Sequence, residues 1–165
     1  MTVRLEVPEA RLQHARDVAW KALNRRERTV AELARLLAAK RVEPAAIETV
    51  LAELLEQGYL DDASYAQRFA DDRRRLDAWG AERIERKLLS LGIDRELIAA
   101  AVGEQDHAGE IEAALELLAR RFPEPPRTPR DRDRALGMLV RKGYELELAY
   151  DALRRHCGAR EESFD

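Results

Sequence analysis

The stretch Gly58-Tyr59-Leu60-Asp61-Asp62-Ala63-Ser64-Tyr65-Ala66 marks a point where one helix ends and the next begins. Its glycine suits the left-handed conformation that often closes a helix. Asp61 can accept hydrogen bonds from free amides of the next helix, and Asp61 and Asp62 place negative charge at the positive end of its dipole. Leu60 and Tyr65 are spaced as a hydrophobic staple around this cap. The predicted structural joint consists of Gly58, Tyr59, Leu60, Asp61, Asp62 and Tyr65.

Similar helix starts recur along the chain. Thr29-Val30-Ala31-Glu32 has the sequence of a capping box, and Pro44 suits the first position of another helix. Asp94 is placed to cap a third helix, with Ile93 and Ile98 as its staple. Between these starts, apolar residues recur at the spacing of amphipathic helices. The chain is therefore predicted to be helical from end to end.

An internal repeat of 51 residues organises these helices. Four core positions keep the spacing 5, 5 and 4 in three successive sets: Leu37, Val42, Ile47 and Leu51; Leu88, Ile93, Ile98 and Val102; and Leu139, Tyr144, Ala149 and Leu153. The same offset relates the expected helix starts at Thr29, Gly80 and Asp131, and the turn residues Gly92 and Gly143. Such a period is typical of helical repeat proteins, in which neighbouring units bury each other's remaining apolar faces.

The predicted fold class is all-α, an elongated array of three tandem three-helix repeats with about nine helices in total. Extended surfaces of this kind usually serve binding. The expected boundaries are an N-terminal lead at residues 1–11, repeat 1 at 12–58, repeat 2 at 59–107, repeat 3 at 108–157 with a proline-rich loop at 123–129, and a C-terminal tail at 158–165.

Composition indicates a folded protein of a reducing compartment. Hydrophobic residues make up 45% and charged residues 37% of the 165 residues, which suits a soluble helical protein. The single cysteine, Cys157, excludes an intramolecular disulfide. The N-terminus lacks an apolar signal region, and no apolar run approaches the roughly 18 residues of a membrane span. We therefore expect a cytoplasmic protein without a membrane partner, and the net charge of -3 with no exposed apolar heptad favours a monomer.

Charge is divided into blocks along the sequence. Residues 16–41 carry eight basic and three acidic side chains, whereas residues 43–62 carry six acidic and no basic ones. Residues 120–134, around the proline-rich loop, carry six arginines against three acidic residues. Such blocks suit a partner or polyanion that meets one face of the molecule. Each block taken alone is also compatible with an ordinary solvated helix face.

The sequence contains no pattern that predicts catalysis or a cofactor. The glycines lie at helix ends rather than in a phosphate-binding loop. His14, His107 and His156 are far apart, and the side chains of His156 and Cys157 would point in different directions on a helix. A helix start accounts for Asp61 and Asp62 without any catalytic role. We expect a protein that is not an enzyme and that needs no cofactor or metal.

Arginine clusters are the candidate contact residues. The expected exposed partner interface consists of Arg25, Arg26, Arg28, Arg73, Arg74 and Arg75. Part of this charge is expected to pair locally, Asp71 with Arg75 and Arg68 with Asp72, because these residues are four apart on one helix. The nearby aromatic residues are expected to be core and staple residues rather than platforms for nucleic-acid bases; they are Tyr59, Tyr65, Phe69 and Trp79.

Several of these motifs resemble the RecX family of bacterial regulatory proteins. The first similar segments are Arg25-Arg26-Glu27-Arg28-Thr29 and the following Glu32-Leu33. The next are Gly58-Tyr59-Leu60-Asp61-Asp62 with Tyr65-Ala66, and Leu91-Gly92-Ile93. The resemblance covers roughly residues 12–156, and its most specific part is the structural joint.

This resemblance implies a non-enzymatic modulator of the RecA recombinase that acts in recombination, DNA repair and the SOS response. Family members are understood to bind in the groove of the RecA–DNA filament, limit its growth and inhibit RecA ATPase, strand exchange and coprotease activity. Two other classes stay open: a module that binds DNA directly through its arginine clusters, and a scaffold for another helical partner. DNA contact, direct or within the filament, is compatible with the first two classes.

Overall fold

The structure of the protein is a computed structural model that describes residues 7–158. Within this range the chain forms nine α-helices and no β-strand. The helices are α1 (Glu9–Arg25), α2 (Val30–Ala39), α3 (Pro44–Glu56), α4 (Asp62–Asp77), α5 (Ala81–Ser90), α6 (Arg95–Val102), α7 (His107–Arg121), α8 (Pro129–Lys142) and α9 (Leu146–Gly158).

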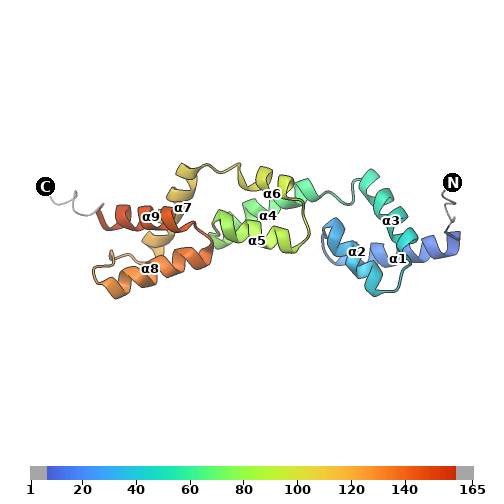
Figure 1. The fold of residues 1–165 in the computed structure, drawn as a ribbon, viewed down its shortest axis with the longest axis horizontal. Helices are drawn as coiled ribbons and strands as arrows, with labels where there is room; N and C mark the ends of the chain where they lie inside the picture. The colour runs from blue at the N-terminus through green and yellow to red at the C-terminus, as the bar shows by residue number, and fades with distance from the viewer. Residues whose placement is uncertain (1–6, 159–165) are drawn as a thin grey trace.

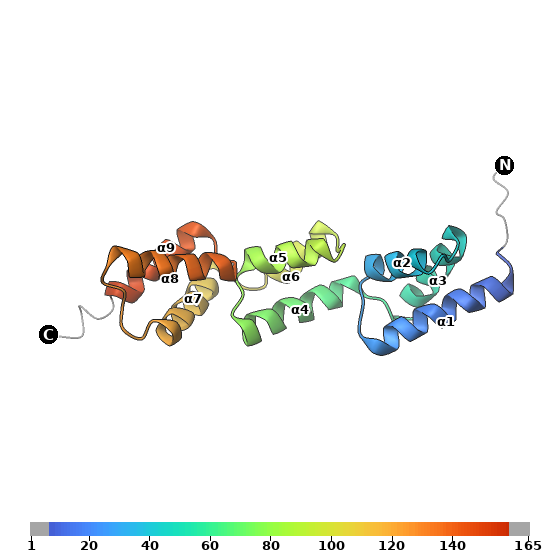
Figure 2. The ribbon, with the colours of Figure 1, turned by 90° about the horizontal axis from the view of Figure 1, so that it is seen from below.

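Figure 1 shows that the helices form three groups along one axis, which we name repeat 1 (α1–α3), repeat 2 (α4–α6) and repeat 3 (α7–α9). The view turned by 90° in Figure 2 shows the same row, with α1 and α9 at opposite ends. The predicted all-α array of tandem three-helix repeats is therefore confirmed, and the molecule is elongated.

Each repeat has a hydrophobic core of its own. The helix pairs that pack extensively all lie within one repeat. The largest buried side chains are Leu33, Leu37 and Val50 in repeat 1, Ile84, Leu88 and Ile93 in repeat 2, and Leu118, Leu139 and Tyr144 in repeat 3. Leu60 belongs to the core of repeat 1, although the expected boundary placed it in repeat 2. The exact boundaries stay a prediction.

The 51-residue period is present in the backbone as well as in the core. The equivalent turn residues Arg41, Gly92 and Gly143 all have a positive φ, of 61°, 79° and 98°. Equivalent fully buried positions are Leu33, Ile84 and Ala135, and Leu37, Leu88 and Leu139. Repeat 3 departs from the period at one helix start. Asp131 lies inside α8, which begins earlier, after Thr128, because Pro129 fits the first helical position.

The N-terminal helix begins earlier than expected. Glu9 is the first residue of α1, with Pro8 before it, whereas the predicted lead extended to residue 11. Glu9 lies in the first turn, where a negative charge complements the helix dipole, and its carboxylate also bonds Arg16 two turns later, at 2.9 Å. Residues 1–6 of the lead and 159–165 of the tail lie outside the described residues.

Two side chains do not behave as their spacing predicts. The helical spacing of Tyr65, Phe69 and Leu76 predicts that Leu76 points inward from α4, but it is 63% exposed, because the buried stripe of this helix runs through Ala66 and Ala70. Asp94 precedes α6 as expected, yet its side chain makes no capping hydrogen bond. Helical spacing therefore located these helices correctly but did not fix every contact at their ends.

Candidate partner-binding surface

The structural joint is attached to two different cores. Gly58 has a φ of 78°, and the amides of Tyr59 and Leu60 donate to the carbonyl of Leu54 at 2.9 and 3.3 Å. Leu60 is 2% exposed within the core of repeat 1, whereas Tyr65 packs against the core of repeat 2. The two expected staple residues thus hold opposite sides of the joint, one in each repeat.

The two aspartates of the joint serve different helices. Asp61 caps α4, as predicted: its carboxylate accepts the Ser64 amide at 3.1 Å and the Ser64 hydroxyl at 2.8 Å, and these hydrogen bonds lower the pKa of Asp61. Asp62 instead reaches the start of α2 in repeat 1, where it accepts the amide of Val30 at 3.0 Å. Burial raises the pKa of Asp62. This second role was not predicted, because its partner lies far away in the sequence.

The predicted capping box at Thr29 is confirmed and also joins two repeats. The Thr29 hydroxyl accepts the Glu32 amide at 3.1 Å, and the Glu32 carboxylate accepts the Thr29 amide at 3.0 Å. The same hydroxyl donates to the carbonyl of Leu91, in the turn between α5 and α6, at 2.7 Å. Together with the bond from Val30 to Asp62, we call this the repeat 1–2 contact.

The corresponding repeat 2–3 contact uses other residues. Ala81, which is equivalent to Val30 in the 51-residue period, donates its amide to the carboxylate of Glu110 on α7 at 3.0 Å. Burial raises the pKa of Glu110. The phenol of Tyr144 donates to the carbonyl of Ala78 at 3.0 Å, and burial raises its pKa to about 12. In both contacts a carboxylate of one repeat caps a helix of the repeat before it.

The first arginine cluster lies at the turn between α1 and α2. Arg25 and Arg26 are exposed, whereas Arg28 is half-buried. Arg26 bonds the Glu32 carboxylate at 3.0 Å, and the Nε of Arg28 donates to the carbonyl of Ala22 at 3.3 Å. Arg28 therefore helps to hold the turn, while Arg25, which makes no ion pair with another described residue, is available to a partner.

The second cluster is mostly structural, so the expectation that all three of its arginines are exposed is wrong. Arg73 is half-buried, bonds Asp77 at 2.5 Å and has its guanidinium 5.8 Å from the ring centre of Trp79. Arg74, also half-buried, donates to the carbonyl of Val102 on α6 at 2.6 Å. Both side chains stabilise the packing of repeat 2.

The remaining arginines of α4 are exposed but do not form the expected pairs. Arg75 pairs with Asp72 at 3.3 Å rather than with Asp71. Arg68 does not pair with Asp72; it forms an ion pair with Glu27, in the turn between α1 and α2. Arg68 and Arg75 therefore pair with the carboxylates that lie closest in space, and not with the aspartates four residues away on α4.

The proline-rich loop presents further exposed cations. Its backbone is held by the end of α9, where a ring nitrogen of His156 lies 2.8 Å from the carbonyl of Phe122 and the Cys157 thiol donates to the carbonyl of Pro126 at 3.7 Å. Four exposed arginines near this loop make no ion pair with any described residue: Arg120, Arg121, Arg127 and Arg130. The charge count at residues 120–134 signalled them, yet they were not among the candidate interface residues.

Tyr59 is the second clear correction among the candidate residues. It was expected to be buried, but 56% of it is exposed, and its ring meets the edge of Trp20 with 4.6 Å between ring centres. Tyr65, Phe69 and Trp79 are half-buried around the core of repeat 2, in agreement with the prediction.

Residues 7–158 contain neither a candidate metal-binding cluster nor a helix that could span a membrane. No cluster of His, Cys, Asp and Glu side chains in this part of the chain is arranged to hold a metal ion. None of its helices combines the length and the apolar character that crossing a membrane requires.

Comparisons with known proteins identify relatives of this chain. Residues 15–54 match the family model of the first three-helix domain of RecX, and residues 61–102 match that of the second. The regulatory protein RecX of Leptothrix cholodnii is 36% identical over 82% of this chain and 85% of the relative. That of Amycolatopsis mediterranei is 31% identical over 89% of this chain and 85% of the relative.

Solved structures agree with the fold. The crystal structure of RecX from Lactobacillus salivarius superposes with a TM-score of 0.79 over 90% of this chain and 98% of that chain, at 17% identity. A second crystal structure, of a regulatory protein RecX, gives a TM-score of 0.73 over 93% of this chain and 81% of that chain, at 21% identity.

Proposed function

This chain belongs to the RecX family of regulatory proteins, and we propose that it binds the RecA–DNA filament and inhibits RecA ATPase, strand exchange and coprotease activity. It acts without catalysing a reaction, in the cytoplasm and as a monomer. An elongated array suits this role, because a protein that lies along a helical filament must contact several subunits in succession.

The observation that carries the proposal is the presence of exposed cations on all three repeats of the array. Arg25 and Arg26 lie in repeat 1 and Arg75 in repeat 2. Repeat 3 carries Arg127 in the proline-rich loop and Arg120, Arg121 and Arg130 beside it, which form no ion pair with a described residue. Basic side chains spread over this length fit a polyanion, or a protein groove beside one. Arg28, Arg73 and Arg74 support this surface by holding helix ends.

The test is the single-stranded-DNA-dependent ATPase of the cognate RecA, measured with this protein far below one molecule per RecA subunit. We expect clear inhibition. The variant Arg25→Glu/Arg127→Glu/Arg130→Glu should lose most of it, and the matched variant with lysine at the same three positions should keep it, because charge is retained. Full inhibition by the glutamate variant would exclude these arginines from the interface, and no inhibition by the natural sequence would overturn the function.

A second candidate is a module that binds DNA directly. It is favoured by Arg127 of the proline-rich loop and Arg130 at the start of α8, which are exposed and unpaired among the described residues. Direct binding would be observed with single-stranded DNA alone, and its affinity would fall steeply with salt as counterions are released. Inhibition of RecA in the absence of such binding would favour the filament proposal.

A further inference from the structure

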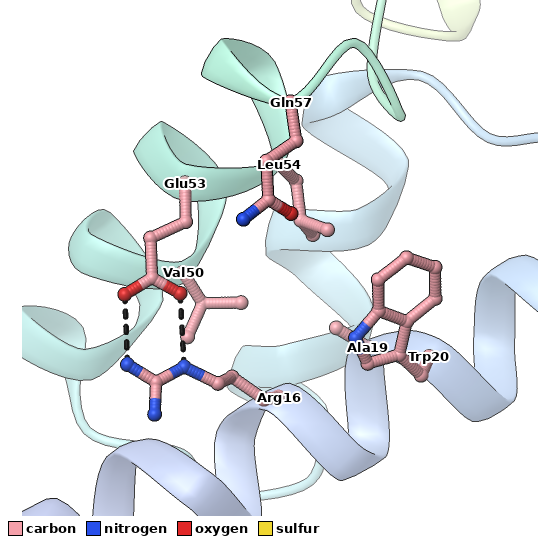
Figure 3. Close-up of a pocket in the computed structure, with 7 residues that line it drawn as sticks. All are labelled: Arg16, Ala19, Trp20, Val50, Glu53, Leu54 and Gln57. Carbon is pink, nitrogen blue, oxygen red and sulfur yellow. Dashed lines mark hydrogen bonds and ion pairs between the residues drawn. The ribbon is translucent and has the colours of Figure 1, made fainter.

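Repeat 1 is held together by its own contacts. Its core, among the described residues, consists of side chains that precede α4, the last of them Leu60. Its first and third helices are also joined at the surface, where the guanidinium of Arg16 makes two hydrogen bonds to the carboxylate of Glu53, at 2.9 and 2.8 Å (Figure 3). Repeat 1 is therefore a compact body whose packing does not depend on repeat 2.

Few bonds cross the repeat 1–2 contact. One hydrogen bond comes from the hydroxyl of Thr29 and one from the amide of Val30, and neither joins backbone to backbone. The ion pair of Arg68 with Glu27 adds a third link, but both side chains are more than half exposed, so water and salt screen it. Within residues 7–158 no further hydrogen bond or ion pair holds repeat 1 to repeat 2.

The repeat 2–3 contact is more extensive. Ala78, at the end of α4, packs against the core of repeat 3. Two backbone amides of repeat 2 donate to backbone carbonyls of repeat 3: that of Gly80 to Lys142 at 2.8 Å, and that of Glu82 to Gly143 at 3.0 Å. Four more hydrogen bonds involve side chains and join Ala81 to Glu110, Lys142 to Asp77, Tyr144 to Ala78, and Arg83 to Arg141.

The 51-residue period explains this difference. Three side chains that donate across the repeat 2–3 contact have counterparts without a donor at the repeat 1–2 contact: Arg83 corresponds to Glu32, Lys142 to Leu91, and Tyr144 to Ile93. Leucine and isoleucine carry no polar hydrogen, and a carboxylate only accepts. The sequence of repeats 1 and 2 therefore lacks the groups that fasten repeat 2 to repeat 3.

The chain passes from repeat 1 to repeat 2 through one short segment, between α3 and α4 (Figure 1). Leu60 is 2% exposed in the core of repeat 1, and the next residue, Asp61, is already the N-cap of α4. Rotation of repeat 1 against repeat 2 therefore requires dihedral changes only at these two residues. Hinges between rigid bodies are usually a few loop or element-terminal residues of this kind.

We propose that the structural joint is a hinge: repeats 2 and 3 move as one body, and repeat 1 rotates against this body about Leu60 and Asp61. The rotation breaks the hydrogen bonds of Thr29 and Val30 but leaves every core intact. Such a device suits a partner whose surface changes its curvature or twist, because one end of the array can follow the change while the other end stays bound. The inference goes beyond the proposed function and depends neither on RecA nor on DNA.

Distances between spin labels test the hinge. Asp71 is exposed on α4 and serves both label pairs, one with Glu48 on α3 and one with Glu116 on α7. Both pairs are built in a Cys157→Ser background, so that only the chosen positions carry a label. By double electron–electron resonance, we expect the distance distribution of Glu48→Cys/Asp71→Cys to be at least about twice as wide as that of Asp71→Cys/Glu116→Cys. Equal widths, or a wider distribution for the second pair, would overturn the proposal.

Loss of donors from the repeat 2–3 contact tests the cause. Lys142→Leu/Tyr144→Phe removes two of its hydrogen bonds and should widen the distribution across that contact, without changing the one across the repeat 1–2 contact. The matched variant Lys87→Leu/Tyr150→Phe makes the same chemical changes at exposed residues that bond no other repeat, and should change neither. Unchanged widths in the first variant, with its helical content intact, would show that these bonds do not hold the repeats together.

Amide hydrogen exchange tests the hinge in the natural sequence. Val30 and Ala81 are equivalent in the period, and each donates its amide to a carboxylate of the next repeat. Because the hinge opens only the first of these bonds, the protection factor of Val30 should be at least about tenfold lower than that of Ala81. Equal protection would contradict the hinge. A hinge without RecA inhibition leaves this proposal standing, whereas inhibition without a hinge overturns it and leaves the proposed function standing.

Discussion

The repeat 1–2 and repeat 2–3 contacts place equivalent elements against each other but join them differently. In both, the turn between the second and third helices of one repeat lies at the start of the second helix of the repeat before it. At the repeat 1–2 contact the Thr29 side chain bridges to this turn, through the carbonyl of Leu91. At the repeat 2–3 contact the equivalent residue is Gly80, whose backbone amide donates to the carbonyl of Lys142 at 2.8 Å.

At this one position the repeat 2–3 contact relies on close backbone approach, whereas the repeat 1–2 contact relies on a side-chain hydrogen bond. A Cβ on Gly80 would lie 2.5 Å from the carbonyl oxygen of Gly143, so no larger residue fits there without a shift. Backbone cannot move aside as a flexible side chain can. We therefore expect the repeat 2–3 contact to be the less tolerant of added volume, and the repeat 1–2 contact to be the more sensitive to loss of a hydroxyl.

The largest effect is expected from alanine at the turn glycines. In Gly143→Ala the new methyl group would lie 2.3 Å from the Cβ of Arg83 and 2.5 Å from its backbone nitrogen, and the left-handed φ of 98° adds strain. We expect a loss of about 3 kcal/mol in the free energy of unfolding, the sum of roughly 1–2 kcal/mol for the conformation and 1–3 for the overlap. In Gly92→Ala the clash is with the Cβ of Ala31, at 2.3 Å.

Rescue distinguishes the two contacts. Removal of the opposing methyl group by Ala31→Gly should restore part of the stability lost in Gly92→Ala, with a coupling of about 1 kcal/mol in a double-mutant cycle measured by urea unfolding. Arg83→Gly should rescue Gly143→Ala less, because it removes the Cβ at 2.3 Å but leaves the backbone nitrogen of Arg83 at 2.5 Å. Equal rescue at both contacts would contradict the proposed difference between side-chain and backbone contact.

Loss of the Thr29 hydroxyl should have the next largest effect. Thr29→Ala removes both an N-cap and the hydrogen bond to Leu91, so we expect it to lower the free energy of unfolding by about 2 kcal/mol. Thr128→Ala is the matched control, since Thr128 caps α8 through the amide of Asp131 but makes no bond to another repeat. It should cost about 1 kcal/mol. Equal losses of unfolding free energy in the two variants would show that the hydrogen bond from Thr29 to Leu91 contributes no measurable stability.

The core and the helix starts could be predicted from sequence because they depend on short spacings. Leucines at positions 37, 88 and 139 share one offset, and all three are buried. Gly58 and Thr29 were identified by local patterns whose partners lie within a few residues. Asp62 and Glu110 were missed as inter-repeat caps, because each acts on a helix roughly thirty residues earlier, and only the stacking of repeats brings them together.

The arginine cluster on α4 was misjudged for a geometric reason. Three consecutive residues of an α-helix point in directions about 100° apart, so Arg73, Arg74 and Arg75 cannot share one exposed face. The structure leaves Arg75 exposed and uses the other two in packing. A helical projection of α4 would have separated them. Conversely, the exposure of Tyr59 depends on how it packs on Trp20, which no pattern within the joint indicates.

A smaller effect is expected from the phenol of Tyr144. Tyr144→Phe removes its hydrogen bond to the carbonyl of Ala78 and should lower the free energy of unfolding by about 1 kcal/mol, without changing Thr29 or its partners. Because the pKa is raised to about 12 in the folded protein and is near 10 when unfolded, the natural sequence should lose stability as pH rises from about 10 to 12, and the variant should not. An unchanged alkaline profile would contradict a buried, donating phenol.

The smallest changes in stability should come from substitution of the two inter-repeat capping carboxylates, Asp62 and Glu110. The change with pH should have the same direction at both contacts. Burial raises the pKa of Asp62 and of Glu110, so each contribution to stability is greatest below the unfolded pKa, near 4, and is lost as pH rises through the folded value. Asp62→Asn and Glu110→Gln keep an acceptor oxygen without this loss. At pH 7 both should be at least as stable as the natural sequence, and the gain should vanish in acid.

Asp61→Asn is the control of opposite sign, one residue away from Asp62. Its capping hydrogen bonds lower the pKa of Asp61, so the charged carboxylate contributes stability above the unfolded pKa and loses it as pH falls through the folded value. The asparagine variant should therefore be less stable at pH 7, with a difference that shrinks in acid. Urea unfolding of all three variants between pH 3 and 7 measures these signs. If Asp62→Asn, like Asp61→Asn, were less stable at pH 7 and recovered in acid, Asp62 would be an ordinary cap of α4 rather than a link between repeats.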